Sequence, residues 1–334
     1  PPSDSGPVLK KIFIKLSTAV KMATRWKKIR RWLNTTAEEF SHQFTDPLLR
    51  EAFKEMWDPA FPVFFFLFTF AFLHAKNAGY PIGGSLPIAM AMAERYTSLG
   101  GSIQYNTRVE KILVENDKAV GIRLTNGNTY HADRVISAAD GHSTIFEMLD
   151  GKYIDDKTRE PYEKWPLFPA LLYIGIGVNR SFDDVPKTVY GINYPLNEPV
   201  EIADALRERL LVHFFNHDPT LSPAGKTTIV VMMPSSYEYW RVLLQDEAVY
   251  EDRKKQVGNT VVELLDQRFP GISEDVDMVD VATPLTFNRY TGNWKGTFEG
   301  WLITPENVDA VRKGLPQTLP GLENFYMCGQ WVEP

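Results

Sequence analysis

The chain has 334 residues, of which 44% are hydrophobic and 23% charged, and its formal net charge is -6. This is the composition of a globular protein with room for two domains, and it excludes fibrous, collagen-like and low-complexity classes. The single cysteine, Cys328, excludes an internal disulfide, and no CxxC motif or His/Cys cluster indicates a zinc site, so we expect a reducing, intracellular setting.

The N-terminal segment is strongly basic. Nine of the 36 Lys and Arg residues lie between Lys10 and Arg31, with no Asp or Glu among them. Apolar residues at steps of three or four predict an amphipathic helix here, with Phe13 and Trp26 on its apolar face. Such a helix is typical of an anionic membrane surface, and equally of a core-packing helix with a solvated basic face. Nucleic acid is disfavoured as a partner, because the rest of the chain is acidic and repels phosphate.

Two helix starts and one apolar run follow. Thr36 and Glu39 form a capping-box pattern, and Asp46-Pro47 combines an N-cap residue with proline at the first helical position. From residue 61 to 73 nearly every residue is apolar, over a stretch shorter than the roughly 20 residues that cross a bilayer. We interpret this run as a buried helix or the wall of a large apolar pocket, with shallow insertion into lipid as the alternative.

A glycine turn, a hairpin and a short strand are predicted next. Gly83 and Gly84 precede a small-residue helix over 86–99, so the loop backbone can approach a ligand closely. Alternating strands are predicted over 108–114 and 119–124. The segment 134–140 is predicted as a buried strand that ends in small residues, which leave room for a ligand in an α/β sheet.

The second half of the chain is predicted to form a sheet with helices. The predicted strands cover 171–178, 210–215, 228–233 and 275–283, the predicted helix covers 246–269, and the predicted loops cover 183–184, 193–199 and 216–223. Tyr237, Tyr239 and Trp240 are interpreted as core residues, with a pocket lining as the alternative.

A set of short motifs is spread along the chain from about Thr35 onward. The motifs occupy residues 81–84, 100–101, 106–109 with 112, 135–140, 283–286, 289–294 and 324–331. In this order they resemble the phytoene desaturase-like family of flavoproteins. The resemblance implies a mixed α/β (α+β) fold, with an incomplete FAD/NAD(P)-binding Rossmann-like lobe and a substrate lobe of antiparallel sheet and helices.

The same resemblance implies a function and a domain plan. The implied chemistry is hydride transfer to or from FAD on a large apolar polyene or isoprenoid substrate at a membrane surface, as in desaturation, saturation or isomerisation. Residues 1–78 are then the helical part of the substrate or membrane-facing lobe, and 79–150 the middle of the FAD-binding lobe. Residues 151–284 are the substrate lobe, and 285–334 return to the FAD-binding lobe.

The resemblance also implies site residues. Val109 would offer its backbone to the adenine, and Trp331 would lie beside the flavin with its two preceding residues. The expected cofactor-binding residues are Gly83, Gly84, Val109, Ala138, Ala139, Asp140, Gly329, Gln330 and Trp331. Arg289, Tyr290 and Trp294 are the candidates near the flavin ring or the pocket mouth, and no metal is expected.

One family feature is absent from the 334 residues. A GxGxxG turn normally holds the pyrophosphate of such cofactors, and the nearest pattern, at 175–180, lacks the third glycine and is predicted to be sheet. The chain opens with Pro1 rather than Met, and the family's glycine-rich stretch after Pro334 is missing too. We therefore expect a truncated chain that binds FAD weakly or not at all and is inactive alone.

Two other functions stay open. One is a membrane-peripheral lipid-binding or scaffold module without redox activity, and the other is an amine-oxidase-like flavoenzyme. No GxSxG motif indicates a hydrolase, and no HExxH motif surrounds His213 and His217. The expected location is cytoplasmic and peripheral at the membrane.

Overall fold

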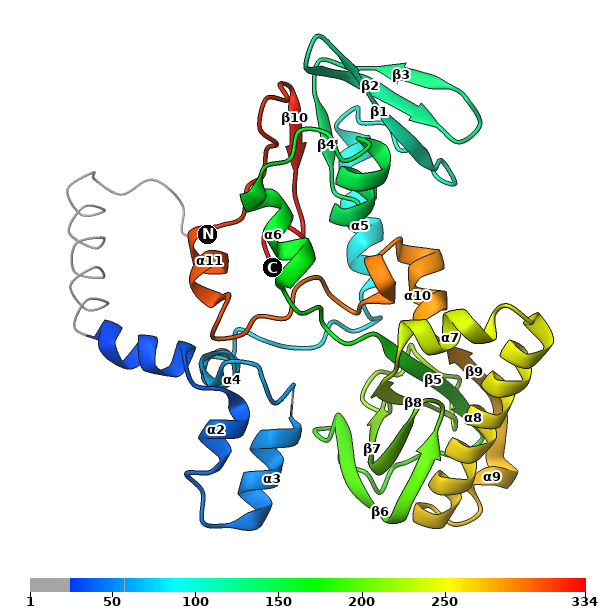
Figure 1. Ribbon diagram of the computed structural model, residues 1–334. Helices are drawn as coiled ribbons and strands as arrows, with labels where there is room; N and C mark the ends of the chain where they lie inside the picture. The colour runs from blue at the N-terminus through cyan, green and yellow to red at the C-terminus, as the bar shows by residue number, and fades with distance from the viewer. Residues whose placement is uncertain (1–24, 57) are drawn as a thin grey trace. The chain divides into compact units, whose positions relative to one another are not determined.

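The computed structural model describes residues 25–56 and 58–334 (Figure 1). Most of the predicted basic helix, including Phe13, therefore lies outside the described residues. The chain divides into two compact units, Pro1–Gly79 with Leu302–Leu315 and Tyr80–Trp301 with Pro316–Pro334. The first unit's N-terminal part ends at Gly79, and the first predicted segment ends at residue 78. The predicted partition of the chain into cofactor and substrate segments stays a prediction.

The first unit is helical. It contains a helix over 25–33 together with α2 (Ala37–Ser41), α3 (Pro47–Glu55), α4 (Val63–His74) and α11 (Val308–Lys313). The predicted capping box is present: Thr36 Oγ1 accepts from Glu39 N at 3.1 Å, and Thr36 N donates to Glu39 Oε2 at 2.9 Å. Asp46 Oδ1 caps α3 through the N–H groups of Leu48 and Leu49, as its pairing with Pro47 predicts.

Helix α4 contains the phenylalanine run. Val63 and Phe66 in its first half are buried, as is Phe61 just before the helix, which agrees with the prediction of a buried helix. The second half differs, because Phe68, Phe70, Phe72 and Leu73 are between 39% and 54% exposed. A run that is apolar on every side cannot be covered on every side by one small helical unit. Within residues 25–56 and 58–334, no helix combines the length and the apolar character needed to cross a membrane.

The second unit begins with helix α5 (Leu86–Ser98) and an antiparallel meander of β1 (Val109–Glu115), β2 (Lys118–Leu124) and β3 (Thr129–His131). Asn116 and Asp117 join β1 to β2 with φ values of 50° and 59°. Left-handed conformation at both central residues is typical of the tight turn that matches the twist of a hairpin. Helix α5 has no buried residue.

Strand β4 (Val135–Ser137) pairs in parallel with β10 (Phe325–Met327), almost two hundred residues later in the chain (Figure 1). The prediction of a buried strand over 134–140 is wrong, because the strand is short and Ile136 is 66% exposed. Within the described residues β4 and β10 form a two-stranded sheet, so the other edge of each strand has no strand partner there.

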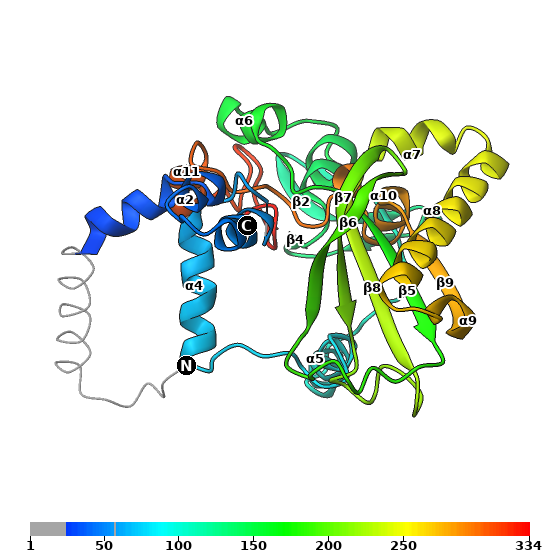
Figure 2. The ribbon, with the colours of Figure 1, turned by 90° about the horizontal axis from the view of Figure 1, so that it is seen from below.

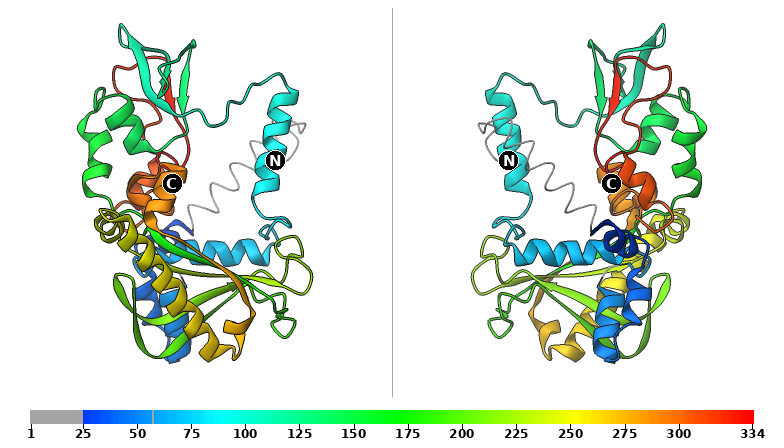
Figure 3. Two further views of the ribbon diagram at one scale, coloured as in Figure 1. Left: turned by 90° about the vertical axis from the view of Figure 1, so that its right-hand side faces the viewer. Right: turned by 90° about the vertical axis from the view of Figure 1, so that its left-hand side faces the viewer.

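The largest described sheet is antiparallel, in the order β6-β7-β8-β5-β9. The strands are β5 (Leu171–Val178), β6 (Gly191–Ile202), β7 (Ala205–Phe214), β8 (Thr227–Pro234) and β9 (Val276–Ala282). Helices α7 (Tyr237–Leu243), α8 (Glu247–Arg268) and α9 (Ile272–Asp275) lie to one side of this sheet (Figures 2 and 3). All predicted strands and the long predicted helix of this region are present.

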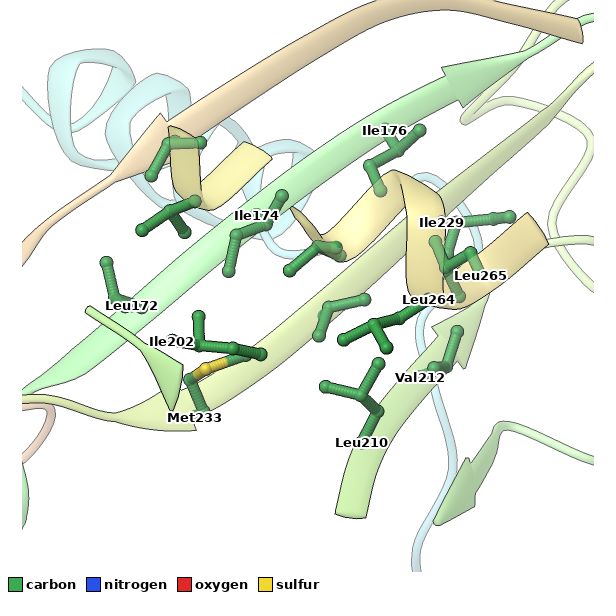
Figure 4. Packing of buried hydrophobic residues seen from close by; sticks show 14 of the residues in the cluster. Leu172, Ile174, Ile176, Ile202, Leu210, Val212, Ile229, Met233, Leu264 and Leu265 are labelled. Carbon is green, nitrogen blue, oxygen red and sulfur yellow. The ribbon is translucent and has the colours of Figure 1, made fainter. Parts of the chain in front are cut away.

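The core of the second unit lies between α8 and one face of the sheet (Figure 4). Leu172, Ile174 and Ile176 alternate along β5 and are 0–1% exposed. Gly258 lets α8 approach the sheet, since a Cβ there would lie 3.0 Å from Val279 Cγ1. Trp240 is fully buried in this core, so its interpretation as a core residue holds.

The predicted loop at 193–199 is wrong. These residues belong to β6, which pairs with β7 from Gly191 to Ile202 with a register shift between Pro195 and Val200. Proline and asparagine disfavour central strands, but β6 is an edge strand with an irregularity, where a missing N–H is tolerated.

Candidate functional site

The carboxyl ends of β4 and β10 meet at one edge, because the two strands run parallel. The N–H of Cys328 continues the pairing by donating to Ser137 O at 2.9 Å. The segment 138–140 follows β4 and the segment 328–331 follows β10, so the two segments lie side by side. Ligands of open α/β sheets bind at this kind of edge.

Asp140 ties this edge to a third segment. Its Oδ1 accepts from Ser143 N at 2.7 Å and its Oδ2 accepts from Trp294 N at 2.9 Å. Burial, the largest effect, raises the pKa of the Asp140 carboxyl, and the hydrogen bonds from Ser143 and Trp294 act in the opposite direction. Both carboxyl oxygens are engaged by the protein, so Asp140 positions Trp294.

Trp294 belongs to a cluster of aromatic rings. Trp294 stacks on His142 with ring centroids 4.5 Å apart and an interplanar angle of 7°. Trp331 packs edge-on against Trp301 at 5.0 Å, and Trp301 Nε1 donates to Trp331 O at 3.2 Å. Tyr162 lies 4.9 Å from Trp301. Burial raises the pKa of the Tyr162 hydroxyl, so this group stays protonated.

A cavity of about 390 Å³ opens beside the rings. Its lining comes from the π-helical turn Ser143–Met148, from α6 (Asp156–Lys164) and from the loops next to them. The lining residues are His142, Phe146, Gly151, Ile154, Arg159, Tyr162, Glu163 and Trp294.

The turn after β10 presents unused donors. Gly329 has φ 92°, and no atom lies within 4 Å of the position of a Cβ there, so the backbone is open to close approach. Among the described residues, no acceptor bonds the backbone N–H of Gln330 or Trp331, and the buried Trp331 Nε1 also lacks one. These groups fit a planar cofactor with acceptor atoms along its edge, as the flavin ring has.

The other predicted residues lie apart from this set. Gly83 and Gly84 have φ values of 89° and 75°, and Gly83 N donates to Asp218 Oδ2 at 2.6 Å. Val109 faces Leu124 in the hairpin. Within residues 25–56 and 58–334, no hydrogen bond or ring contact joins the two glycines or Val109 to Asp140 or Trp331.

Of the three candidates near the flavin ring, Arg289, Tyr290 and Trp294, only Trp294 contacts the aromatic cluster among the described residues. They lie on or after α10 (Pro284–Thr291), where Trp294 joins the aromatic cluster. Tyr290 is 77% exposed, and the Arg289 guanidinium lies 4.8 Å from its ring. Trp294 is thus the candidate that the structure places beside Asp140.

The comparison with a protein-family model decides the family. Residues 28–333 match the model described as flavin containing amine oxidoreductase. The chain belongs to this family.

Relatives of this family member carry carotenoid-related names. The chain is 28% identical over 264 residues to a chloroplastic prolycopene isomerase of Daucus carota, covering 78% of the chain and 42% of the relative. It is 30% identical over 268 residues to a neurosporene-forming phytoene desaturase of Cereibacter sphaeroides, covering 76% and 50%. The resemblance to phytoene desaturase-like flavoproteins is confirmed, and the chain spans about half the length of these relatives or less.

Two solved structures share the fold of this family member. An oxidoreductase from Methanosarcina mazei superposes with a TM-score of 0.56 at 18% identity, over 93% of the chain and 67% of that protein. A putrescine oxidase double mutant redesigned in cofactor binding gives 0.53 at 15% identity, over 89% and 63%. The predicted fold class is confirmed: an incomplete Rossmann-like lobe together with an antiparallel sheet and helices.

Sequence reasoning missed His142, Tyr162 and Trp301. His142 follows Asp140 by two residues, so its position after the predicted strand was a signal for the site. The other two come from α6 and from a loop, and no local pattern brings them to β4. In the described part of the chain, no group of three His, Cys, Asp or Glu side chains could hold a metal, and His213 and His217 form no such site.

Proposed function

We propose a flavin-dependent oxidoreductase that acts on a large apolar, polyene- or isoprenoid-like substrate by hydride transfer to or from FAD. The observation that carries this proposal is a set of donors without a partner among the described residues, namely the backbone N–H groups of Gln330 and Trp331 and the Trp331 indole N–H. They lie at the carboxyl edge of a parallel strand pair in a flavin-containing family. The likeness to proteins named prolycopene isomerase and phytoene desaturase supports the substrate class.

Bound FAD would supply the hydride chemistry. The backbone N–H groups of Gln330 and Trp331 and the Trp331 indole would donate hydrogen bonds to it. Asp140 would hold Trp294 in place, and the rings of Trp294, Trp301 and Tyr162 would exclude water from this edge.

The 334-residue chain is proposed to bind FAD weakly, because the sequence lacks a GxGxxG turn for the pyrophosphate. When the purified chain is titrated with FAD, binding should not reach saturation at one FAD per chain. A yellow chain that retains one FAD per molecule through gel filtration would contradict this proposal.

The activity is tested on a polypeptide extended by the flanking sequence of the source gene and loaded with FAD. Anaerobic addition of a carotenoid polyene should change the visible absorbance of the flavin. No change with any polyene, despite bound FAD, would overturn the oxidoreductase proposal. Reduction by amines but not by polyenes would favour the amine-oxidase-like alternative.

A membrane surface is proposed as a partner. The described helix over 25–33 carries basic residues at 25, 27, 28, 30 and 31, and α4 exposes Phe68, Phe70 and Phe72. Basic and apolar side chains together favour anionic lipid. Co-sedimentation with vesicles should require anionic lipid and weaken as the salt concentration rises. Binding that depends on neither anionic lipid nor salt would contradict the proposed membrane partner.

A lipid-binding module without redox activity would use the same basic and apolar residues. Vesicle binding combined with no flavin chemistry in the extended polypeptide would favour that alternative. We propose a cytoplasmic location, peripheral to the membrane, and fractionation of source cells tests it.

A further inference from the structure

Asn293 lies in the turn that follows α10, and hydrogen bonds on both its backbone and its side chain fix it there. Its backbone N–H donates to Thr291 Oγ1 at 3.2 Å, and its backbone oxygen accepts from Gly296 N at 2.9 Å. Its side chain has two partners: Nδ2 donates to Thr297 O at 3.2 Å, and Oδ1 accepts from Gln330 Nε2 at 3.1 Å. The Asn293 side chain therefore connects the turn after α10 to the turn after β10.

These partners set the orientation of both side-chain amides. A carbonyl oxygen only accepts hydrogen bonds, so Asn293 turns its NH2 group toward Thr297 O and its own oxygen toward Gln330. The Asn293 side-chain oxygen in turn only accepts, so Gln330 turns its NH2 group toward Asn293. The oxygen of the Gln330 amide, Oε1, is then the atom left for another group.

Gln330 Oε1 is an unused acceptor with a restricted position. It has no hydrogen-bond partner among the described residues, and these residues do not enclose it. Gln330 is half-buried, and Gly300 packs closely against it: a Cβ on Gly300 would lie 2.9 Å from Gln330 O and 3.6 Å from Gln330 Cγ. A side chain that is packed at its base and hydrogen-bonded at its end keeps few rotamers, so Oε1 is held in place.

This acceptor belongs to the same turn as the donors proposed for the flavin. The backbone N–H groups of Gln330 and Trp331 have no acceptor among the described residues. A flavin cofactor carries donors as well as acceptors, namely the imide N–H of its ring and the hydroxyl groups of its ribityl chain. A turn that offered N–H donors alone would leave such a group of the bound cofactor unpaired, which is costly in a buried site. Gln330 Oε1 supplies the acceptor that the N–H groups lack.

We propose that Asn293 is a positioning residue for the cofactor: it turns the Gln330 amide so that Oε1 accepts a hydrogen bond from an N–H or hydroxyl group of the flavin. The inference rests on the flavin-binding part of the proposed function, because it assigns a role to residues beside the proposed flavin. Asn293 acts through Gln330 and contacts no cofactor atom itself. The polarity that Gln330 presents therefore depends on a residue 37 positions earlier in the chain.

The test measures flavin binding by the flavin-free form of the polypeptide extended by the flanking sequence of the source gene. Fluorescence titration gives the affinity for FAD of the wild type, Gln330→Met, Asn293→Ala and the double variant. Gln330→Met removes the acceptor at similar side-chain length and should weaken FAD about fivefold, the effect of one net hydrogen bond. Asn293→Ala removes the group that orients the amide and should weaken FAD by the same factor or less.

The double variant separates positioning from a structural role. If Asn293 acts through Gln330, Asn293→Ala should have no further effect on FAD affinity once Gln330→Met is present. Asn293→Asp keeps an oxygen acceptor facing Gln330 and should restore most of the affinity that Asn293→Ala loses. The matched control is Gln245→Met, at an exposed position just after α7, which should leave the affinity unchanged.

Flavin analogues distinguish the two kinds of donor group. Lumiflavin lacks the ribityl hydroxyl groups, and lumiflavin methylated at the imide nitrogen also lacks the ring N–H. If the ring N–H is the donor, Gln330→Met should weaken lumiflavin about fivefold and leave the methylated analogue unchanged. If a ribityl hydroxyl is the donor, Gln330→Met should weaken riboflavin and leave both analogues unchanged.

The proposal is overturned if Gln330→Met binds FAD as tightly as the wild type, or if Asn293→Ala weakens FAD equally with and without Gln330→Met. These are binding measurements, so their outcome is separate from the redox test. The expected pattern of affinities, together with no flavin reduction by any polyene or amine, would refute the proposed oxidoreductase and leave the role of Asn293 standing. An extended polypeptide that binds no flavin would overturn both.

Discussion

Asp218 holds two loops of the second unit together. Its Oδ2 accepts from Gly83 N at 2.6 Å, while its Oδ1 accepts from Thr220 N at 2.9 Å and from Thr220 Oγ1 at 2.7 Å. The hydrogen bond from the Thr220 hydroxyl, the largest effect, and those from the two backbone N–H groups hold the pKa of Asp218 below its usual range. The carboxylate thus fixes the glycine turn before α5.

We expect Asp218→Asn to lower the stability of the chain at pH 7. A carboxyl group whose folded-state pKa is depressed stabilises the fold above its unfolded pKa of about 3.9, and this contribution is lost as the pH falls through the folded-state value. The difference between wild type and variant should therefore shrink below about pH 4. Urea denaturation from pH 7 to pH 3 measures it.

The control for this experiment is Asp184→Asn, at an exposed position in a loop. It should leave the stability unchanged across the same pH range. A constant difference between Asp218→Asn and wild type at all pH values would contradict the assignment.

The variant Trp331→Phe tests whether the Trp331 indole N–H contacts the flavin or serves only the structure of the protein. The Trp331 indole N–H has no partner in the described residues, so its removal breaks no hydrogen bond in the flavin-free protein, and any loss of stability there reports the lost packing of the buried ring against Trp301. In the FAD-loaded extended polypeptide, the affinity for flavin should fall about fivefold, because one hydrogen bond to the cofactor is lost. Flavin fluorescence titration measures this, with Trp32→Phe as control. Equal affinity in both variants would rule out the contact.

The residues of the site were only partly predictable. Asp140, Trp294 and Trp331 were expected from their motifs, and the structure brings them together. The stacking of His142 on Trp294 accompanies the hydrogen bond from Trp294 N to Asp140, and both contacts join segments about 150 residues apart in the chain. Local patterns carry no information on such contacts, so sequence reasoning missed His142 as it missed Tyr162.

Individual elements follow their local signals closely. Helix α8 starts where Asp246 caps it, with Oδ1 accepting from Ala248 N at 3.0 Å and Val249 N at 3.3 Å. Strand β5 occupies the predicted residues, because its apolar residues are flanked by clear breaks. Strand β6 was missed because its turn-forming residues reflect an irregular edge, where the pairing with β7 outweighs the local propensity.

Asp246→Ala should destabilise the second unit by about 1 kcal/mol, the usual cost of losing an N-cap. Glu263→Ala, at an exposed position inside α8, is the matched control and should cost nothing, since alanine favours helices. Chemical denaturation followed by circular dichroism compares them. Equal stability of both variants would show that the cap does not contribute.

At the scale of the whole molecule, the main hydrophobic core is the cluster between the five-stranded sheet and α8. The buried residues of β5, β8 and α8 form a single cluster, whereas α5 has no buried residue. The sequence predicted the strands β5, β7, β8 and β9 and the helix of this core. The strand order could not be read from the sequence, because it depends on pairings between distant segments.

The rates of amide hydrogen exchange should differ between the buried core and the exposed helix α5. Amides of β5, which is bonded on both sides by β8 and β9, should exchange more slowly than those of α5 by about tenfold or more. Mass spectrometry of peptides from 171–178 and 86–98 measures the two rates. Equal protection would contradict the placement of the core.

Cys328 allows site-specific labelling of the protein. It is the one thiol in the sequence, it is exposed, and it directly follows β10 at the edge where the flavin is proposed to bind. A maleimide dye would therefore attach at a single defined position without any prior mutagenesis. Energy transfer from that dye to a bound flavin would report cofactor arrival in real time.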